Sequence, residues 1–145
     1  LDIANNARND PRAEIIVGDG IGFIKECERY DVIIVDSTDP IGAAKELFDE
    51  VFYKDARNIA DAIVTQAGPL LLDVENVTRV KNLIESSFGR ATIYHYDVMG
   101  YASPWAFVMG GVQYSPNIER FAGIKTKFLN ERSIALLSAI PRFIQ

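Results

Sequence analysis

The stretch at residues 31–35, which reads Asp-Val-Ile-Ile-Val, constrains the fold of this chain more than any other feature. Its four β-branched residues follow one another without the polar alternation of a strand that faces water on one side. Such a run is typical of a parallel strand that is covered on both faces. It therefore predicts a buried strand of an α/β protein, which ends directly before Asp36.

Helical and strand-like segments alternate on both sides of this stretch. Apolar spacing and turn residues predict helices at residues 21–28, 45–63 and 77–88, the last closed by Gly89, and strands at residues 14–17, 70–72, 91–98 and 105–109. This order predicts a mostly parallel, Rossmann-like sheet with an antiparallel last strand. We expect the tail from residue 117 onward to pack on the sheet as helix and loop.

The composition narrows the class of protein further. With 145 residues, of which 48% are hydrophobic and 24% charged, the chain is typical of one globular domain. Its net charge of -5 argues against nucleic acid or an anionic membrane as a partner and suits a cationic ligand. No apolar run reaches the roughly 18 residues of a membrane span. The single Cys27 cannot form an internal disulfide, and the first residues do not resemble a signal peptide, so we expect a cytoplasmic protein.

Carboxylates follow three of the predicted strands. In open α/β sheets ligands bind at the carboxyl ends of the strands, and these ends carry Asp19, the loop at residues 36–40, and Asp73. Asp36 and Asp39 bracket that loop, where one carboxylate can take a proton and the other can bind an ammonium group. The alternative is that either one is a turn former or a helix cap, since Asp-Ser-Thr-Asp-Pro is also good turn chemistry.

The other chemically capable residues have two interpretations as well. Asp19 is either a turn residue between two glycines or an acceptor for an adenine or ribose hydrogen bond. Tyr101 and Trp105 flank a Ser-Pro turn and are either core residues or the wall of a pocket for an aliphatic or cationic ligand. His95 and Cys27 are interpreted as structural, and the sequence has no zinc-ligand spacing and no Walker loop.

Several motifs, taken in order, resemble the signature regions of the spermidine synthase family. The specific one is the Asp-Ser-Thr-Asp-Pro-Ile-Gly stretch at residues 36–42, which follows a Gly-Asp-Gly turn at residues 18–20. The similarity extends over essentially the whole chain through Leu47-Phe48, Phe52-Tyr53, Tyr101-Ala102-Ser103, Lys127-Phe128-Leu129 and Pro141-Arg142-Phe143.

The resemblance implies a methyltransferase-like fold and transfer of an aminopropyl group from decarboxylated S-adenosylmethionine to a diamine such as putrescine, with no metal. By position in the family motif, Asp36 is expected to deprotonate the attacking amine. The binding residues are expected at the strand ends: Asp39, Asp73, Tyr101 and Trp105 for the diamine, and Asp19, Gly20 and Ser37 for the adenosyl group of the co-substrate.

Two departures from the family pattern bear on this interpretation. Asp73 stands where the family usually has a Gln at the end of the third strand, so the sequence does not decide which amine is the substrate. The family's N-terminal β-domain and Gly-rich cofactor turn are absent, so residues 1–145 are expected to form a single partial catalytic domain with impaired activity. The alternative is a non-catalytic binding or assembly module derived from the same fold, and a related methyltransferase is less favoured.

The family's sheet order, 3-2-1-4-5-7-6, implies that this chain supplies strand 3 and strands 4 to 7. The sheet would then lack two strands in its middle and expose backbone edges that invite pairing. Either another chain supplies the missing part, or the chain dimerises, or strand 3 moves next to strand 4. The expected partners are therefore a diamine and either a second copy of the chain or a chain that supplies the N-terminal half.

Overall fold

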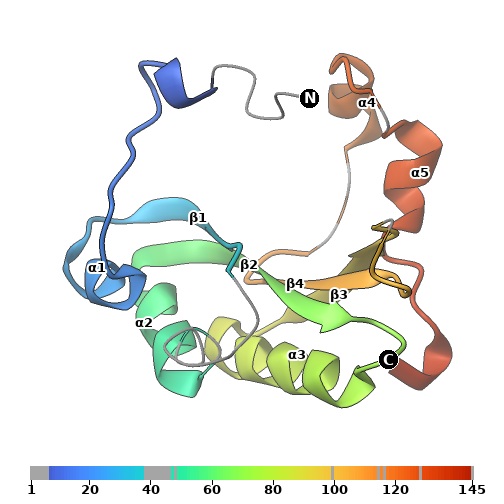
Figure 1. Ribbon diagram of the computed structural model, residues 1–145, viewed down its shortest axis with the longest axis horizontal. Helices are drawn as coiled ribbons and strands as arrows, with labels where there is room; N and C mark the ends of the chain where they lie inside the picture. The colour runs from blue at the N-terminus through green and yellow to red at the C-terminus, as the bar shows by residue number, and fades with distance from the viewer. Residues whose placement is uncertain are drawn as a thin grey trace.

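The computed structural model describes residues 7–37, 47, 49–98, 100–113, 115, 117–127 and 129–144. The α-helices and β-strands of this part, labelled in Figure 1, are α1 (Gly20–Glu26), β1 (Tyr30–Val35), α2 (Glu50–Ile59), β2 (Ala60–Pro69), α3 (Val74–Phe88), β3 (Ala91–Tyr96), β4 (Trp105–Gly110), α4 (Ile118–Ala122) and α5 (Glu131–Leu136). The described part also contains two short 3₁₀ helices, η1 (Ala7–Asn9) and η3 (Arg142–Ile144).

The strands form one mixed sheet in the order β1-β2-β4-β3. β1 runs parallel to β2, whereas β4 is antiparallel to both of its neighbours, β2 and β3. α2 connects the two parallel strands, and α3 leads from β2 to β3. The predicted α/β class, with a parallel pair and an antiparallel last strand, is confirmed for this part of the chain.

The strand predicted at residues 14–17 is wrong. These residues pair with no strand of the described part, and Ile15, Ile16 and Val17 are 64%, 59% and 96% exposed. An apolar extended segment becomes a strand only when a neighbour satisfies its backbone N–H and C=O groups. Of the arrangements considered above, the one in which this segment pairs directly with β1 is not adopted.

The boundary between α2 and β2 also differs from the prediction. The sequence predicts a helix over residues 45–63 and a strand at residues 70–72, whereas β2 begins at Ala60, runs for ten residues, and is followed by a turn at residues 70–72. Ile59 and Ile63 lie four positions apart and therefore fit helical spacing, but the β-branched residues 63–65 favour a strand. Because β2 begins earlier than the predicted strand, Gln66 lies inside it.

α2 and α3 cover one face of the sheet and form the core with it (Figure 1). The fully buried side chains of this contact include Ile63 and Thr65 of β2, Val108 of β4, and Val77, Val80 and Ile84 of α3. A side chain at Gly110 would place its Cβ 2.3 Å from Ile84 Cγ2, so this glycine lets α3 approach the sheet. α3 ends at Gly89, whose φ of 80° is the left-handed cap that the sequence predicts.

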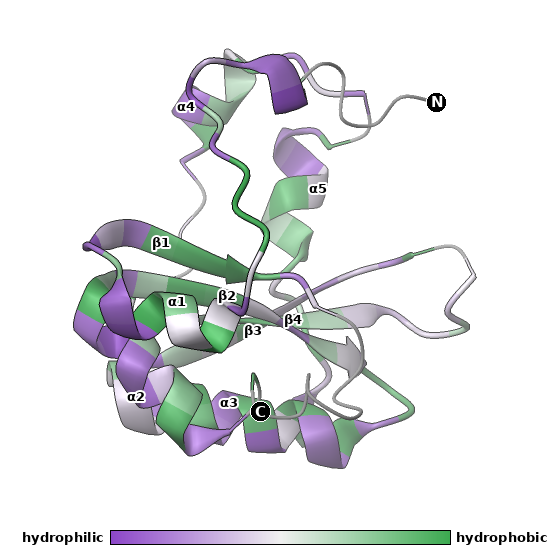
Figure 2. Ribbon diagram, turned by 60° about the vertical axis from the view of Figure 1, so that its left-hand side comes forward, coloured by the Kyte–Doolittle hydropathy of each residue, from purple (hydrophilic) through white to green (hydrophobic). Residues whose placement is uncertain are grey.

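The opposite face of the sheet is covered less completely. α4 and α5 lie on that side, as Figures 1 and 2 show, and the backbone N–H of His95 in β3 donates to the Leu137 carbonyl at 2.8 Å. At the other end of the sheet, Val32 and Ile34 of β1 are 47% and 69% exposed. Among the described strands β1 pairs only with β2, so a strand rich in apolar residues stands at an open edge. The prediction of a strand at residues 31–35 is confirmed, but the prediction that this strand is covered on both faces is wrong for the described part of the chain.

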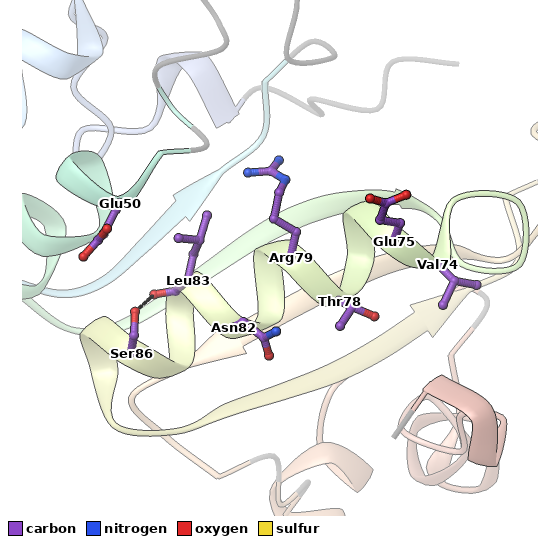
Figure 3. Close-up of a pocket in the computed structure, with 8 residues that line it drawn as sticks. All are labelled: Glu50, Val74, Glu75, Thr78, Arg79, Asn82, Leu83 and Ser86. Carbon is purple, nitrogen blue, oxygen red and sulfur yellow. Dashed lines mark hydrogen bonds between the residues drawn. The ribbon is translucent and has the colours of Figure 1, made fainter.

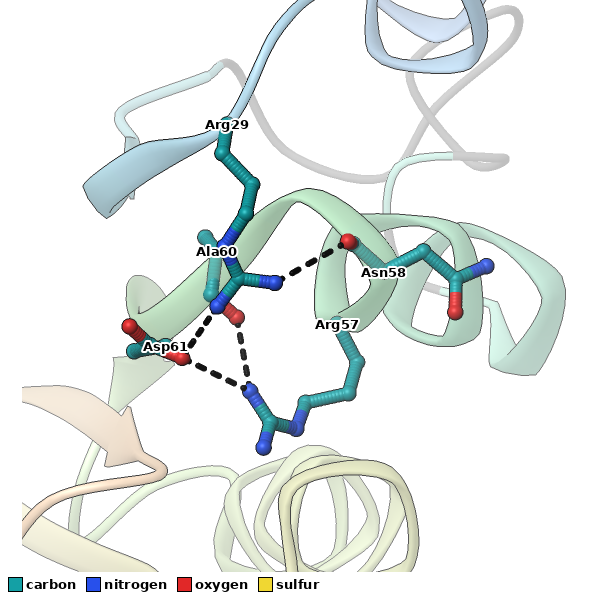
Figure 4. A network of polar contacts seen from close by, with 5 residues as sticks. All are labelled: Arg29, Arg57, Asn58, Ala60 and Asp61. Carbon is teal, nitrogen blue, oxygen red and sulfur yellow. Dashed lines mark hydrogen bonds and ion pairs between the residues drawn. The ribbon is translucent and has the colours of Figure 1, made fainter.

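A polar contact joins the amino ends of β1 and β2 (Figure 4). Arg29, which precedes β1, places its Nη2 2.5 Å from Asp61 Oδ1, and Arg57 of α2 donates to the Ala60 carbonyl at 3.0 Å. The guanidinium of Arg29, helped by that of Arg57, lowers the pKa of Asp61. Because the groups are exposed, the contact adds little stability. It marks the end of the sheet opposite to the carboxyl ends of the parallel strands.

Because of Tyr53 of α2, the stability of the protein is expected to fall as the pH rises in the alkaline range. Its side chain is completely buried, and burial raises the pKa of Tyr53 to about 12. The Thr65 hydroxyl lowers that pKa only in part and forms no hydrogen bond of standard geometry with Tyr53 Oη. A phenol whose pKa is raised by folding contributes stability that is present below the unfolded pKa of about 10 and is lost as the pH rises through the folded value.

We predict that Tyr53→Phe, which retains the ring and removes the phenol, stabilises the protein at alkaline pH. The gain in free energy of unfolding over the parent should be about 1.4 kcal/mol larger at pH 11 than at pH 8. Urea denaturation at the two pH values measures it, with Tyr30→Phe, a tyrosine that is 46% exposed, as the matched control. An equal effect of Tyr53→Phe at both pH values would contradict the prediction.

Candidate functional site

The carboxyl ends of the parallel strands meet the start of β4 at one edge of the sheet. Val35 pairs with Thr65, so the two residues that follow β1 lie level with Gln66 of β2. β4 is antiparallel to β2 and begins with Trp105, which pairs with Pro69. Residues that are about 30 and 40 positions apart in the sequence are thereby brought together where an open α/β sheet binds ligands.

Gln66 is the residue that links these segments. Its side chain is half-buried, its Nε2 donates to the carbonyl of Ser37, and its Oε1 accepts from the indole Nε1–H of Trp105 at 3.1 Å. Gln66 is not among the predicted site residues, because the predicted helix at residues 45–63 and the predicted strand at residues 70–72 leave it in the loop between them. The available signal was a single amide side chain that follows the β-branched residues 63–65.

Tyr101 and Trp105 form an aromatic pair beside Gln66. Their ring centroids are 4.4 Å apart with an interplanar angle of 34°, and Tyr101 is 53% exposed. The β3–β4 loop that carries Tyr101 is held to the turn after β2, since Leu71 N donates to Ser103 Oγ at 3.1 Å. Trp105 is half-buried in β4 and Tyr101 is exposed, so the pair extends from the sheet to the solvent.

Asp36 is exposed directly after β1, and its carboxylate has no hydrogen bond or ion pair within the described part of the chain. Its neighbour Ser37 is half-buried. Asp39, the second carboxylate predicted for this loop, lies outside the described residues. The predicted pairing of the two carboxylates therefore remains a prediction.

Asp73 caps α3 instead of ending a strand. Its Oδ1 accepts from the Asn76 backbone N–H at 3.2 Å. The expectation that Asp73 lies at the end of the third strand is wrong, because that strand is β2, which ends at Pro69 and is followed by a turn at residues 70–72. The cap occupies one carboxylate oxygen of an exposed side chain, and the other oxygen faces no partner among the described residues.

Asp19 has the corresponding position at α1. Its two carboxylate oxygens accept from the backbone N–H groups of Ile21 and Gly22, each at 3.1 Å, and Gly20 is the first residue of the helix. Asp19 and Gly20 border a hollow whose lining also includes Phe23 and Tyr30, two rings with centroids 6.5 Å apart. Asp19 is thus the N-cap of α1, and its carboxylate retains lone pairs that can accept further hydrogen bonds, so its role in binding stays a prediction.

A second hollow lies along the outer side of α3 (Figure 3). Glu75 and Arg79 of α3 and Glu50 of α2 are its charged lining residues. The Arg79 guanidinium donates to Asn76 Oδ1 at 2.8 Å. None of the predicted site residues borders this hollow, so it is separate from the edge formed by Gln66 and the aromatic pair.

Two further features are absent from the described residues. No three or more His, Cys, Asp or Glu side chains gather there in a way that could hold a metal ion. None of the helices of this part has the length and apolar character needed to cross a membrane.

Sequence comparison relates the chain to enzymes that act on polyamines. Residues 1–120 match the spermine/spermidine synthase domain. Polyamine aminopropyltransferases of Thermococcus kodakarensis, Pyrococcus abyssi and Archaeoglobus fulgidus are 38%, 36% and 40% identical to the chain over 95%, 92% and 88% of its length. The chain spans about half the length of these relatives, at 51%, 50% and 48%.

Solved structures of spermidine synthases have the same fold as this chain. A spermidine synthase in complex with the transition-state analogue AdoDATO matches with a TM-score of 0.83 and 25% identity, over 95% of this chain and 51% of that one. Spermidine synthase from Thermotoga maritima has the same fold, with a TM-score of 0.80 and 24% identity. The chain thus has the α/β fold of these spermidine synthase structures. More particularly, the chain belongs to the spermine/spermidine synthase family.

The capping role of Asp73 can be separated from any role in binding. We predict that Asp73→Ala lowers the free energy of unfolding by about 1 kcal/mol, because the Asn76 N–H loses its acceptor, whereas Asp73→Asn changes it by only a few tenths. Urea denaturation measures both, with Asp97→Ala at another exposed position as the control. Equal destabilisation by Asp73→Asn and Asp73→Ala would contradict the capping role.

Proposed function

We propose that residues 1–145 form part of the catalytic domain of a polyamine aminopropyltransferase, which transfers an aminopropyl group from decarboxylated S-adenosylmethionine to a diamine such as putrescine. The observation that carries the proposal is the end of β1, where the exposed Asp36 has no hydrogen bond or ion pair with any described residue and adjoins Ser37, which Gln66 links to the aromatic pair. The names of the relatives and the AdoDATO complex of a related structure support the same chemistry.

Asp36 is proposed to act as the general base. A protonated amine has no lone pair, so it must lose a proton before it can attack the carbon beside a sulfonium. In the proposed step the amine nitrogen bonds to that carbon, the carbon–sulfur bond breaks with its electron pair going to sulfur, and the amine proton goes to Asp36. The products are the extended polyamine and methylthioadenosine, and no metal enters the proposal.

The amine is proposed to bind between carboxylates and aromatic rings. Asp39 would hold the distal ammonium group, and the free oxygen of Asp73 would add a second negative charge nearby. Tyr101 and Trp105 would pack against the methylene chain and attract the cation through their ring faces. The net charge of -5 favours the approach of a substrate with two positive charges.

The adenosyl group is proposed to lie toward α1. Asp19, with both oxygens held by backbone N–H groups, would accept a hydrogen bond from the adenine through its remaining lone pairs. Gly20 and Ser37 would lie against the same group, because glycine has no side chain and serine has a small one, which permits close approach. A cytoplasmic location also stays a prediction.

We predict that Asp36→Asn lowers kcat about 10²- to 10⁴-fold and changes the KM for putrescine little, because it removes proton acceptance and retains the shape of the side chain. The measurement is methylthioadenosine formed from decarboxylated S-adenosylmethionine and putrescine. Asp31→Asn, at the opposite end of β1, is the matched control.

Equal effects of Asp36→Asn and Asp31→Asn would contradict the base assignment. If the parent chain forms no product and calorimetry detects no binding of methylthioadenosine or putrescine, the transferase proposal fails. The non-catalytic module then becomes the better interpretation.

The open edge of β1 favours association as a second property. Val32 and Ile34 project from a strand with no neighbour on one side within the described sheet. We propose that this edge is covered by further polypeptide, either a second copy of the chain or a chain that supplies the N-terminal half of an aminopropyltransferase. Exposed apolar edge strands pair readily with other chains.

We predict that Ile34→Lys shifts the mass of the purified chain toward the monomer in light scattering, because a charge on the edge strand opposes pairing. The apparent dissociation constant should rise at least about tenfold, which corresponds to about 1.4 kcal/mol. Leu136→Lys on α5, at a side chain that is 65% exposed, is the control. Equal masses for the parent and both variants would contradict self-association through β1.

A further inference from the structure

We infer that Gln66 is a positioning residue, which couples the segment that carries Asp36 to the aromatic pair of Tyr101 and Trp105. The inference rests on the proposed function, because it assigns Gln66 a part in keeping the base and the amine-binding wall in a defined relation. It concerns a residue that touches Ser37 and Trp105 and acts through them.

The orientation of the Gln66 amide follows from the chemistry of its partners. An indole N–H can only donate, so Trp105 must face the amide oxygen, which it does at 3.1 Å. A backbone carbonyl can only accept, so Ser37 must face the amide nitrogen. An amide side chain offers one donor group and one acceptor group on a single planar unit, so it joins these two partners in one orientation alone.

The backbone beneath Gln66 is itself held in place. The pairing of β2 with β4 shifts register between Gln66 and Gly68, and Gly68 has a φ of +91°. Asn76 of α3 donates its Nδ2–H to the Ala67 carbonyl at 3.0 Å, inside this irregularity. A bulge in a strand re-aims the side chains beside it, and here α3 fixes the bulge from the core side. The backbone of Gln66 is therefore held firmly between the segment that contains Ser37 and the start of β4.

Gln66 therefore links the position of the Asp36 segment to the position of the Tyr101–Trp105 pair. Ser37 adjoins Asp36, and Trp105 is 4.4 Å from the ring of Tyr101, centroid to centroid. The Asp36 side chain has no hydrogen bond or ion pair in the described part of the chain, so beyond the last ladder pair, Val35 with Thr65, the Ser37 carbonyl ties its segment to β2. Loss of the Gln66 amide should release the Asp36 segment and leave the core intact.

Two substitutions separate the two halves of the coupling. Gln66→Leu removes both hydrogen bonds, whereas Gln66→Glu keeps an acceptor for the Trp105 N–H and replaces the donor to Ser37 with a second acceptor. Gln113→Leu makes the same chemical change as Gln66→Leu at an exposed position and serves as the matched control. Trp105 is the single tryptophan of the chain, so its fluorescence reports on this contact alone.

The experiment first measures the ligand-free protein. Hydrogen exchange of the backbone amides at residues 35–37 should rise about fivefold in Gln66→Leu and in Gln66→Glu, the effect of losing one hydrogen bond, and should not change in Gln113→Leu. Acrylamide quenching of Trp105 should increase in Gln66→Leu and stay near the parent value in Gln66→Glu. Unchanged exchange at residues 35–37 in both Gln66 variants, with the protein folded by circular dichroism, would overturn the inference.

Kinetics then connects the coupling to the proposed reaction. Both Gln66 variants should lower kcat for aminopropyl transfer about tenfold or more. The KM for putrescine should rise only in Gln66→Leu, because only this variant also releases Trp105. If exchange rises as expected but the parent has no transferase activity, the proposed function fails and the coupling stands. If exchange rises and both variants keep the parent's kcat, the positioning role is overturned.

Discussion

The parallel register of β1 and β2 is the constraint on which the candidate site depends. Pairing of Val35 with Thr65 sets the first residues after β1 level with Gln66. A shift by one residue would turn Gln66 to the core face and bring a core side chain to the site edge, because strand side chains alternate between faces. The fully buried Ile63 and Thr65 oppose such a shift, so the packing of the core specifies the geometry of the edge.

α3 connects core stability with the site. Its buried face lies over β2 and β4, where Gly110 permits close contact with Ile84. Its first turn begins at the Asp73 cap and carries Asn76, which donates to the carbonyl of Ala67 in the irregular part of β2. One helix thus covers the apolar face and supports the backbone that aims Gln66. Substitutions in its first turn affect both stability and the alignment of the edge.

The open edge of β1 adjoins the proposed base. Asp36 follows Val35 directly, and Ile34, one position earlier, is 69% exposed. A surface that covers Ile34 would also remove water from around Asp36. The two proposals, transfer and association, therefore meet at the same residues, since covering the edge would change the environment of the base.

Local sequence determined the elements whose signals are self-contained. The strand at residues 31–35, the helix that is capped by Gly89, and the position of Asp36 directly after a strand follow from side-chain shape and backbone preference. The burial of residues 31–35 did not follow, because it depends on what covers the strand. The sequence did not determine whether residues 14–17 form a strand, because a strand exists only through a partner. Tertiary structure also decided that residue 60 begins β2, and that Gln66 joins Ser37 to Trp105. Those partners lie 29 and 39 positions away, and hydrogen bonds over such separations depend on the register of the sheet.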